Sequence, residues 1–174
     1  DTGVDYNHED LQDNIWTNSA EVSGQKGTDD DNNGYVDDVH GINLIDPNET
    51  PMDDHGHGTH VAGIIAMENN NVGGVGIAYK SKIMPIKAGG SDGTFNSTDI
   101  AKAIVYAYKN GADVINMSFG SYAHSALIEN ALQDAFSSCV LVAAAGNDGM
   151  PTADCPFGGQ NMYPASYSYV IGVM

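Results

Sequence analysis

Apolar positions along the chain follow two spacings, one typical of buried strands and one typical of amphipathic helices. Four short apolar runs favour strands, and they span residues 82–88, 113–119, 139–146 and 169–174. Three stretches with apolar residues three and four positions apart predict helices, and they span residues 57–67, 98–109 and 128–136. Strands alternate with helices over short connections. The pattern therefore predicts an α/β fold with a doubly wound, mostly parallel sheet.

Local signals refine these elements. Pro85 lacks a backbone N–H and should weaken the strand at 82–88. Asn110-Gly111 predicts the end of one helix, and the segment NNNVGG at 69–74 lies past the end of another. The run CVLVAAAG at 139–146 is apolar throughout, which is typical of a strand buried on both faces of a parallel sheet.

The chain has two cysteines, without CxxC spacing. Cys139 opens an apolar strand, so we expect it to be a small core residue. A bridge between Cys139 and Cys155 is the alternative.

The charge pattern narrows the choice of partners. The formal net charge is −17, and residues 1–54 hold 15 of the 23 acidic residues but one of the six basic ones. Such a surface repels phosphates, which argues against nucleic acid. With 174 residues and without 18 consecutive apolar residues, the sequence predicts one domain that spans no membrane. Calcium is a natural counter-ion for the acidic segment.

One acidic stretch, DDDNNGYVDD at 29–38, has the spacing with which an EF-hand-type calcium loop begins. Its matching residues are Asp29, Asp31, Asn33, Gly34 and Tyr35, the last through its carbonyl. Position 12 holds His40 instead of a bidentate Glu, so Asp37 or Asp38 would have to compensate. A solvated Asx-rich turn is the alternative.

Residues 55–63, HGHGTHVAG, place three histidines within six positions. A zinc cluster would need His55, His57 and His60 to converge with a further ligand, and the HExxH pattern is absent. A single catalytic histidine, His57, at the start of the helix is a second interpretation. A structural turn is the third, and spacing alone leaves all three open.

Two further segments are candidates for strand ends, where α/β folds place their active sites. Asp1-Thr2-Gly3 offers a carboxylate that can orient an imidazole. Asn147 in AAAGNDG offers an amide that can bind an oxyanion. Each segment taken alone also reads as a turn.

In this order, DTGVDYNHEDL, DDHGHGTHVAGIIA and VAAAGND closely resemble the subtilisin-like serine peptidases (subtilases), and the resemblance covers nearly the whole chain. It implies a three-layer α/β fold with helices on both sheet faces. It also implies an endopeptidase with an Asp-His-Ser triad that acts through an acyl-enzyme. Asp1 would orient the histidine, His57 would be the general base, and Asn147 would bind the oxyanion.

The resemblance also implies substrates and binding segments. Protein or peptide substrates would add as a strand between two cleft walls. One wall would contain Ser118, Phe119 and Gly120, and the facing wall Gly93 and Thr94. A secreted or cell-surface location and no organic cofactor are expected, while the oligomeric state stays open.

A second calcium site is implied by the resemblance alone. Asp10 would supply a carboxylate, and the loop at 69–74 would wrap the ion. The ligands in that loop would be the Asn70 side chain and the carbonyls of Val72 and Gly74.

One part of the family's pattern is missing. The Gly-Thr-Ser-Met-Ala motif, which carries the nucleophile, does not occur in these 174 residues, and Ser118 stands in a cleft-wall motif. The chain opens on Asp1 without a Met, so we expect residues 1–174 to be a partial catalytic domain, truncated at both ends and inactive by itself. The nucleophile would lie beyond residue 174. The alternative is a non-catalytic, subtilase-like calcium-binding domain.

Overall fold

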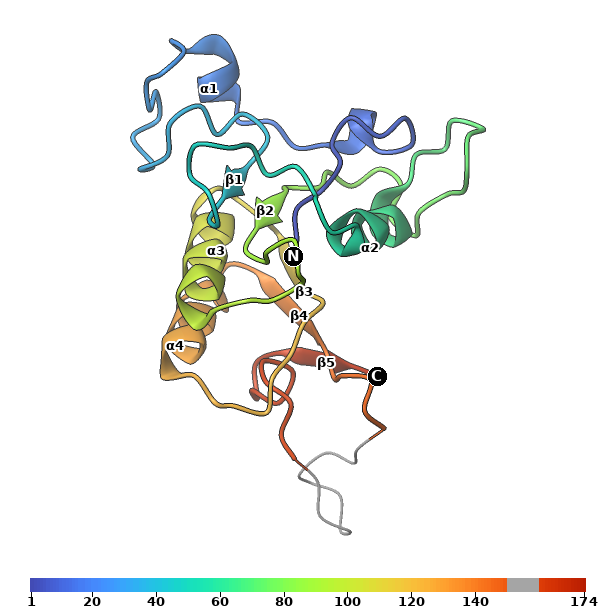
Figure 1. The fold of residues 1–174 in the computed structure, drawn as a ribbon, viewed down its shortest axis with the longest axis vertical. Coiled ribbons are helices and arrows are strands. Elements are labelled where there is room, and N and C mark those ends of the chain that lie inside the picture. The colour runs from blue at the N-terminus through green and yellow to red at the C-terminus, as the bar shows by residue number, and fades with distance from the viewer. Residues whose placement is uncertain (150–159) are drawn as a thin grey trace. The chain divides into compact units, whose positions relative to one another are not determined.

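The computed structural model describes residues 1–149 and 160–174, which form two compact units, Asp1–Phe95 and Asn96–Met174 (Figure 1). Each unit contains its own small sheet, and every pairing between named strands of the described residues is parallel. Parallel strands joined through helices are what the alternating pattern predicts. The α/β class is therefore confirmed, while the division of residues 1–174 into domains stays a prediction.

The first unit is rich in loops. Its elements are η1 (Gln12–Asn14), α1 (Ser19–Ser23), β1 (Ile42–Asn43), α2 (His57–Ala66) and β2 (Ile86–Lys87). Ile42 pairs with Ile86, and Asn43 pairs with Lys87. The unit also contains a buried cluster made of Val4, Leu11, Ile15 and Ala62, with Tyr6 and Ile83 against it.

Helix α2 begins where the sequence predicts and ends one residue earlier. Gly56 precedes it with φ of 97°, a left-handed conformation that favours glycine, and the N–H of Met67 bonds back to Gly63 at its end. The strand expected at 82–88 is reduced to Ile86–Lys87, preceded by an isolated bridge between Ile15 and Ile83. The interruption falls at Pro85, as the missing N–H predicts.

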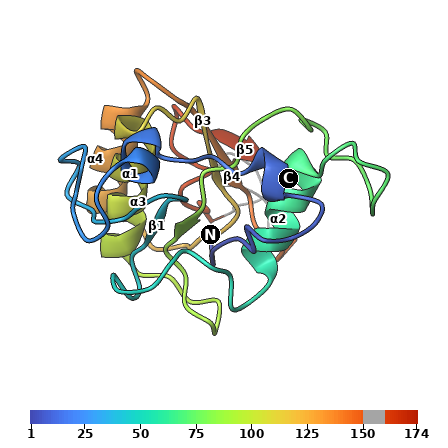
Figure 2. The same ribbon diagram turned by 90° about the horizontal axis from the view of Figure 1, so that it is seen from above.

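The second unit alternates helices and strands. Its elements are α3 (Ser97–Lys109), β3 (Val114–Met117), α4 (Ala126–Ala135), β4 (Val140–Ala144) and β5 (Ile171–Val173). The side chains of Asn96 and Ser125 cap α3 and α4 by accepting backbone N–H groups of the first turns. The two helices lie side by side in both views (Figures 1 and 2) and contact each other.

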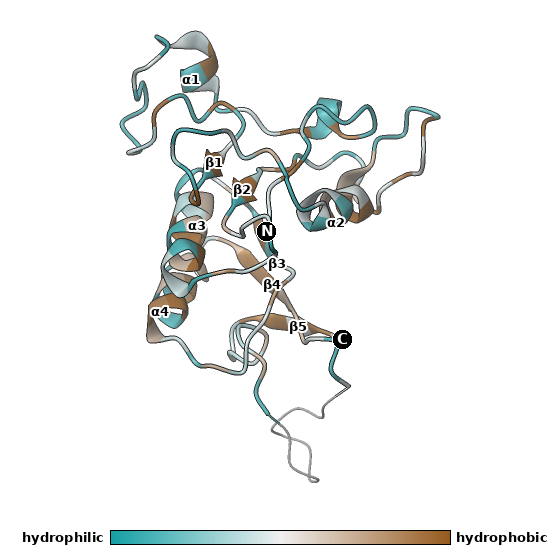
Figure 3. Cartoon of the chain, viewed as in Figure 1, coloured by the Kyte–Doolittle hydropathy of each residue, from teal (hydrophilic) through white to brown (hydrophobic). Residues whose placement is uncertain are grey.

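The three-stranded sheet of this unit has the order β3-β4-β5, and both β4 and β5 are apolar (Figure 3). Its residues alternate in burial. Ile115, Met117, Leu141 and Ala143 are buried, whereas Val114 and Val140 are 55% and 50% exposed. The expectation that the 139–146 run is buried on both faces is therefore wrong for the described chain, because successive strand side chains point to opposite faces and one face is open. Helices on both faces of the complete sheet stay a prediction.

Cys139 is a buried free thiol whose Sγ lies 2.9 Å from the carbonyl oxygen of Ala112. Burial, and then the charge of Asp113, raises the pKa of this thiol. The prediction of a small core residue is confirmed, whereas Cys155 lies outside the described residues. Among the residues described, the helices are too short or too polar to cross a bilayer.

Candidate active site

The first unit brings Asp1 and His57 together although 56 positions separate them. Oδ1 of Asp1 lies 2.7 Å from Nδ1 of His57, a short distance typical of a charge-assisted hydrogen bond. The Asp1 side chain is 14% exposed and that of His57 is 42% exposed. Nε2 of His57 makes no hydrogen bond to residues 1–149 or 160–174. The pair therefore presents an oriented imidazole with a free nitrogen.

The electrostatics of this pair depend on the helix. His57 is the first residue of α2, where the positive end of the helix dipole disfavours a cationic imidazolium. The Asp1 carboxylate offsets that effect across the 2.7 Å contact. Its second oxygen, Oδ2, is buried and makes no hydrogen bond within the described residues, so the carboxylate keeps capacity to stabilise positive charge.

Close backbone contact makes this arrangement possible. A Cβ on Gly58 would lie 2.0 Å from the carbonyl oxygen of Gly3 and 3.2 Å from Oδ1 of Asp1. A Cβ on Gly3, whose φ is 109°, would lie 2.6 Å from the carbonyl oxygen of Pro51. Both positions need glycine. The first three residues can therefore run directly against the first turn of α2.

Two residues near the pair, the buried Thr2 and the partly buried Asp53, were missed by reasoning from the sequence. Thr2, 1% exposed, accepts a hydrogen bond from the N–H of Gly58 and donates one to Asp53. Asp53 also accepts the N–H groups of His55 and Gly56. Asp53 lies two and three residues before the N–H groups that it accepts, just ahead of a helix. This spacing is a local signal that could have identified Asp53 from the sequence.

Lys87 was also missed, and it is 3% exposed. Its Nζ donates to the carbonyl oxygens of Thr2 at 2.7 Å and Gly89 at 3.1 Å, and it forms an ion pair with Asp54. A buried ammonium needs such partners. Lys87 thereby ties the segment that carries Asp1 to strand β2.

Within the described residues, the other histidines of the HGHGTH segment do not converge with His57 on a metal-like site. The rings of His55 and His57 are 6.3 Å apart and nearly perpendicular, and His60 is exposed on α2. In the part of the chain that the structure describes, the metal-like group is the carboxylates of Glu21, Asp29 and Asp31 instead. The geometry favours the single-histidine interpretation over zinc.

The predicted cleft-wall residues of this unit lie in a tight loop. The N–H of Gly90 donates to the carbonyl oxygen of Thr94. Gly93, with φ of 75°, donates its own N–H to the carbonyl oxygen of Gly90. A Cβ on Gly93 would lie 2.9 Å from Nε2 of His55, which places the loop against the histidine segment. Hydrogen bonds from the hydroxyl and the N–H of Thr94 lower the pKa of Asp92.

The remaining site residues belong to the second unit. Asn147 is exposed in the bend after β4, and Gly146 before it has φ of 92°. Ser118, Phe119 and Gly120 follow β3, where the Ser118 hydroxyl accepts a hydrogen bond from Asn116.

A pocket of about 330 Å³ in the same unit is lined in part by Ala145, Gly146 and Met162. The Met162 side chain approaches both predicted segments, because Cβ atoms on Gly120 and Gly146 would each lie 2.7 Å from it. Met162 was missed in the sequence, because it lies in neither motif.

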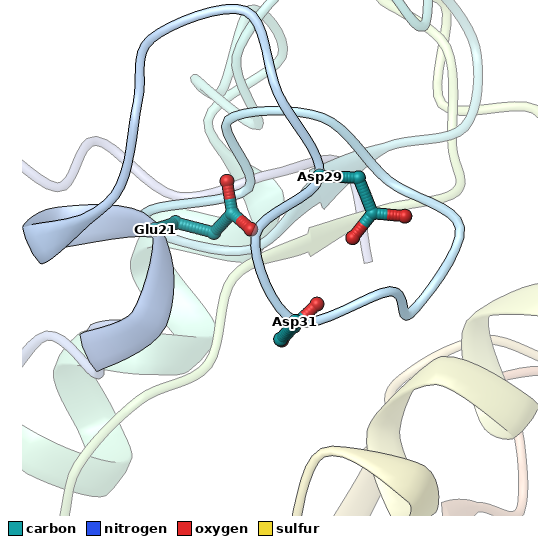
Figure 4. A group of neighbouring side chains, drawn as sticks. All are labelled: Glu21, Asp29 and Asp31. Atoms are coloured by element: carbon teal, nitrogen blue, oxygen red, sulfur yellow. The ribbon is translucent and has the colours of Figure 1, made fainter.

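Acidic side chains of the first unit converge at the predicted calcium loop. Carboxylate oxygens of Glu21, Asp29 and Asp31 lie within 4.8 Å of one another (Figure 4). Glu21, 6% exposed on α1, lies outside the linear motif and was missed. Its carboxylate also accepts the N–H groups of Asp30 and Asp37.

Other predicted ligands of this loop are engaged locally. The Asn33 oxygen accepts the N–H of Tyr35, and the carboxylate of Asp37 accepts the N–H of Gly27. Asp38, 3% exposed, accepts an N–H from the side chain of Asn33. Burial, and then the charge of Asp38, raises the pKa of Tyr35. Asp38 is therefore better placed than Asp37 to face the loop.

The second predicted calcium position contains a buried carboxylate with an unused oxygen. Asp10 is 2% exposed, and its Oδ2 accepts the N–H of Gly74 at 3.3 Å. Its Oδ1 is buried and makes no hydrogen bond within the described residues. The Asn70 side chain donates to the Glu9 carbonyl and accepts the N–H of Val72, so the loop folds over Asp10. An unpaired buried carboxylate oxygen fits a cation.

Comparison with known proteins decides the family. The model of the subtilase family (peptidase S8) matches residues 1–174. The chain belongs to the subtilase family. The fold of this subtilase chain is also subtilisin-like. It superposes on the solved structure of Sphericase with a TM-score of 0.74 and 28% identity, covering 99% of this chain and 50% of that one.

Two curated relatives set the extent of the match. Subtilisin-like protease 1 of Plasmodium falciparum (isolate 3D7) is 44% identical over 134 residues, which are 76% of this subtilase chain and 20% of that protein. The Thermophilic serine proteinase of Bacillus sp. (strain AK1) is 38% identical over 175 residues, which are 99% of this chain and 36% of that protein. The chain therefore spans about a fifth to a third of these relatives.

Proposed function

We propose that this chain provides the Asp, the His and the oxyanion-binding Asn of a serine endopeptidase that acts on protein or peptide substrates. The observation that supports this most is the 2.7 Å contact between Asp1 and His57, with Nε2 of His57 left free. Relatives whose names state a serine proteinase or a subtilisin-like protease add support. The nucleophile would be a serine outside these 174 residues, because the family's serine motif does not occur in them.

In the proposed reaction, Asp1 holds the proton of His57 on Nδ1, so that Nε2 is the basic nitrogen. Nε2 takes the proton of the serine hydroxyl as that oxygen attacks the scissile carbonyl, and later gives it to the leaving amine. The imidazolium that forms between these steps is stabilised by the adjacent carboxylate. Asp1 also opposes the positive end of the α2 dipole, which disfavours the cation.

Asn147 would donate its amide N–H to the oxyanion of the tetrahedral intermediate. Removal of one such donor costs about 3–4 kcal/mol in a comparable enzyme. Substrate would pair with the segments Gly93-Thr94 and Ser118-Phe119-Gly120. The exposed position of Asn147 after β4 supports this role, because its amide is not held by another group of the described chain.

Calcium would stabilise the first unit without taking part in the reaction. Asp10, Asn70 and the carbonyls of Val72 and Gly74 would hold one ion, and the unused Oδ1 of Asp10 supports this site. The carboxylates of Glu21, Asp29 and Asp31 would hold a second, with Asn33, the Tyr35 carbonyl and either Asp37 or the better placed Asp38 as the further predicted ligands. A secreted or cell-surface location, as expected from the resemblance, would supply calcium at millimolar levels.

The test uses a protein that carries this chain together with the serine-bearing segment. A fluorophosphonate should label the serine of the wild type. His57→Ala should abolish labelling, whereas His55→Ala should leave most of it, because His55 does not contact Asp1 in the described chain. Equal losses in both variants would contradict the role of His57. A wild type that is folded and binds calcium but does not label would favour the non-catalytic calcium-binding domain.

A further inference from the structure

One carboxylate, that of Asp53, collects hydrogen bonds from both segments that carry the proposed catalytic pair. Oδ1 accepts the Thr2 hydroxyl at 2.9 Å and the N–H groups of His55 and Gly56 at 3.0 and 2.9 Å. Oδ2 accepts the hydroxyl and the N–H of Thr59 at 2.6 and 2.9 Å. These five donors come from the chain start, the loop before α2 and its first turn.

The network continues beyond Asp53. The Thr2 hydroxyl, which donates to Asp53, accepts the N–H of Gly58 at 2.9 Å. The Thr59 hydroxyl, which also donates to Asp53, accepts the N–H of Asp5 at 2.9 Å. Thr2 is the neighbour of Asp1, and Gly58 is the neighbour of His57. The same carboxylate therefore fixes the backbone on both sides of the 2.7 Å contact.

We propose that Asp53 is a positioning residue that sets the Asp1–His57 hydrogen bond by locking the 1–5 segment onto the first turn of α2. The inference rests on the proposed function for its catalytic consequence, but the geometry it predicts can be measured without activity. Within the described residues Asp53 makes no hydrogen bond to the imidazole or to the Asp1 carboxylate, so it acts through Thr2, Thr59 and the loop N–H groups.

The chemistry of the site requires a carboxylate. All five partners of Asp53 are donors, and an ionised Asp is an acceptor only. An Asn of the same shape would turn its NH₂ group toward at least two of these donors. Burial alone would raise the pKa of Asp53, but the hydrogen bonds from Thr59, Gly56 and His55 outweigh it and hold that pKa well below its usual range. Asp53 therefore stays ionised at neutral pH.

A purely structural role makes a different prediction. If Asp53 only stabilised the loop before α2, its loss would lower the free energy of unfolding and leave the Asp1–His57 contact intact in the folded molecules. If Asp53 positions the pair, folded molecules of the variant should show a weakened contact. The two cases separate in a measurement on the folded state.

The first experiment uses the 174-residue chain and proton NMR. At a pH where His57 is protonated, its Nδ1–H in the contact with Asp1 should give a low-field resonance. Asp53→Asn should broaden or remove this resonance, while Asp46→Asn, which changes a carboxylate in a separate exposed turn, should leave it. Thr2→Val should act like Asp53→Asn, and Thr2→Ser, which keeps the hydroxyl, should restore the resonance. An unchanged resonance in folded Asp53→Asn and Thr2→Val would overturn the proposal.

The second experiment measures peptide hydrolysis in a protein that also carries the serine segment. Asp53→Asn should lower kcat by about 10- to 100-fold with little change in KM, as expected for a misplacement near 1 Å. Thr2→Ser should retain most of kcat, and Thr2→Val should not. A wild type without activity would contradict the proposed function alone, and the resonance would still decide the role of Asp53. If Asp53→Asn does not fold, the two Thr2 variants decide it.

Discussion

Helix α2 contains two buried glycines that make a matched pair of substitutions, Gly58→Ala and Gly63→Ala. Both residues lie within the helix, so alanine improves helix propensity by about 1 kcal/mol at each. Their surroundings differ. A Cβ on Gly63 would meet the flexible side chain of Met67 at 3.6 Å, an ordinary contact, whereas a Cβ on Gly58 would lie 2.0 Å from the Gly3 carbonyl oxygen.

The size of the effect follows from these distances. Carbon–oxygen contacts begin at about 3.3 Å, so the Gly3 backbone or the helix must move by about 1.3 Å to accept Gly58→Ala. Overpacking of this kind costs about 1–3 kcal/mol. A shift of the same size would stretch the 2.7 Å contact between Asp1 and His57 to about 4 Å, beyond hydrogen-bond range.

The assay is urea unfolding followed by the fluorescence of Trp16, the single tryptophan, which lies in the same unit as both glycines. Gly63→Ala should raise the free energy of unfolding by up to about 1 kcal/mol. Gly58→Ala should lower it by up to about 2 kcal/mol, the overpacking cost less the gain in helix propensity, and should also remove the low-field resonance of His57.

Equal stabilisation by the two substitutions would refute the reasoning, because it would show that the first residues do not lie against the helix as the structure has them. Retention of the His57 resonance in Gly58→Ala would contradict the link between this close approach and the Asp1–His57 contact.

Three further outcomes are expected. A chelator should lower the melting temperature of the chain, and Asp10→Asn should reduce this response, whereas the control Asp134→Asn, on α4, should not. No change of the wild-type melting temperature with chelator would contradict calcium binding. Because the pKa of Asp53 is depressed, its contribution to stability should be complete above about pH 4 and be lost as the pH falls below that value. Asp53→Asn should therefore flatten the acid side of the curve of unfolding free energy against pH, measured by urea unfolding. Burial, aided by the charges of Glu129 and Tyr167, raises the pKa of Tyr169 to about 12, so an absorbance titration should show a late phenol step that Tyr169→Phe removes. The stability that this group contributes should be complete below about pH 10 and be lost as the pH rises through about 12.

Much of the second unit could be predicted, because its signals are local. Helices α3 and α4 carry apolar residues at helical spacing, and the bounds of both agree with the sequence within a residue or two. Strand β1 has two residues, too few for any periodicity, and was missed. The open face of β4 was missed because an apolar run does not reveal which neighbours cover it.

The candidate site, too, could be predicted from the sequence only in part. His57 and Asn147 follow local motifs, whereas the residues around the pair are joined over long separations. Thr2 meets Asp53 across 51 positions, and Lys87 meets Thr2 across 85. Such contacts depend on how the elements fold together, and hydrophobic periodicity does not encode them. A single sequence therefore reveals the motifs but not the network that orients them.

The burial of Lys87 turns this residue into a reporter of local opening. An amine-reactive reagent modifies an uncharged, accessible Nζ, and that of Lys87 is enclosed by two carbonyl oxygens and a carboxylate. Exposed lysines such as Lys102 would react at once, whereas Lys87 would react when the segment holding Asp1 separates from β2. The ratio of the two rates, read by mass spectrometry, would give the free energy of that opening without any catalytic assay.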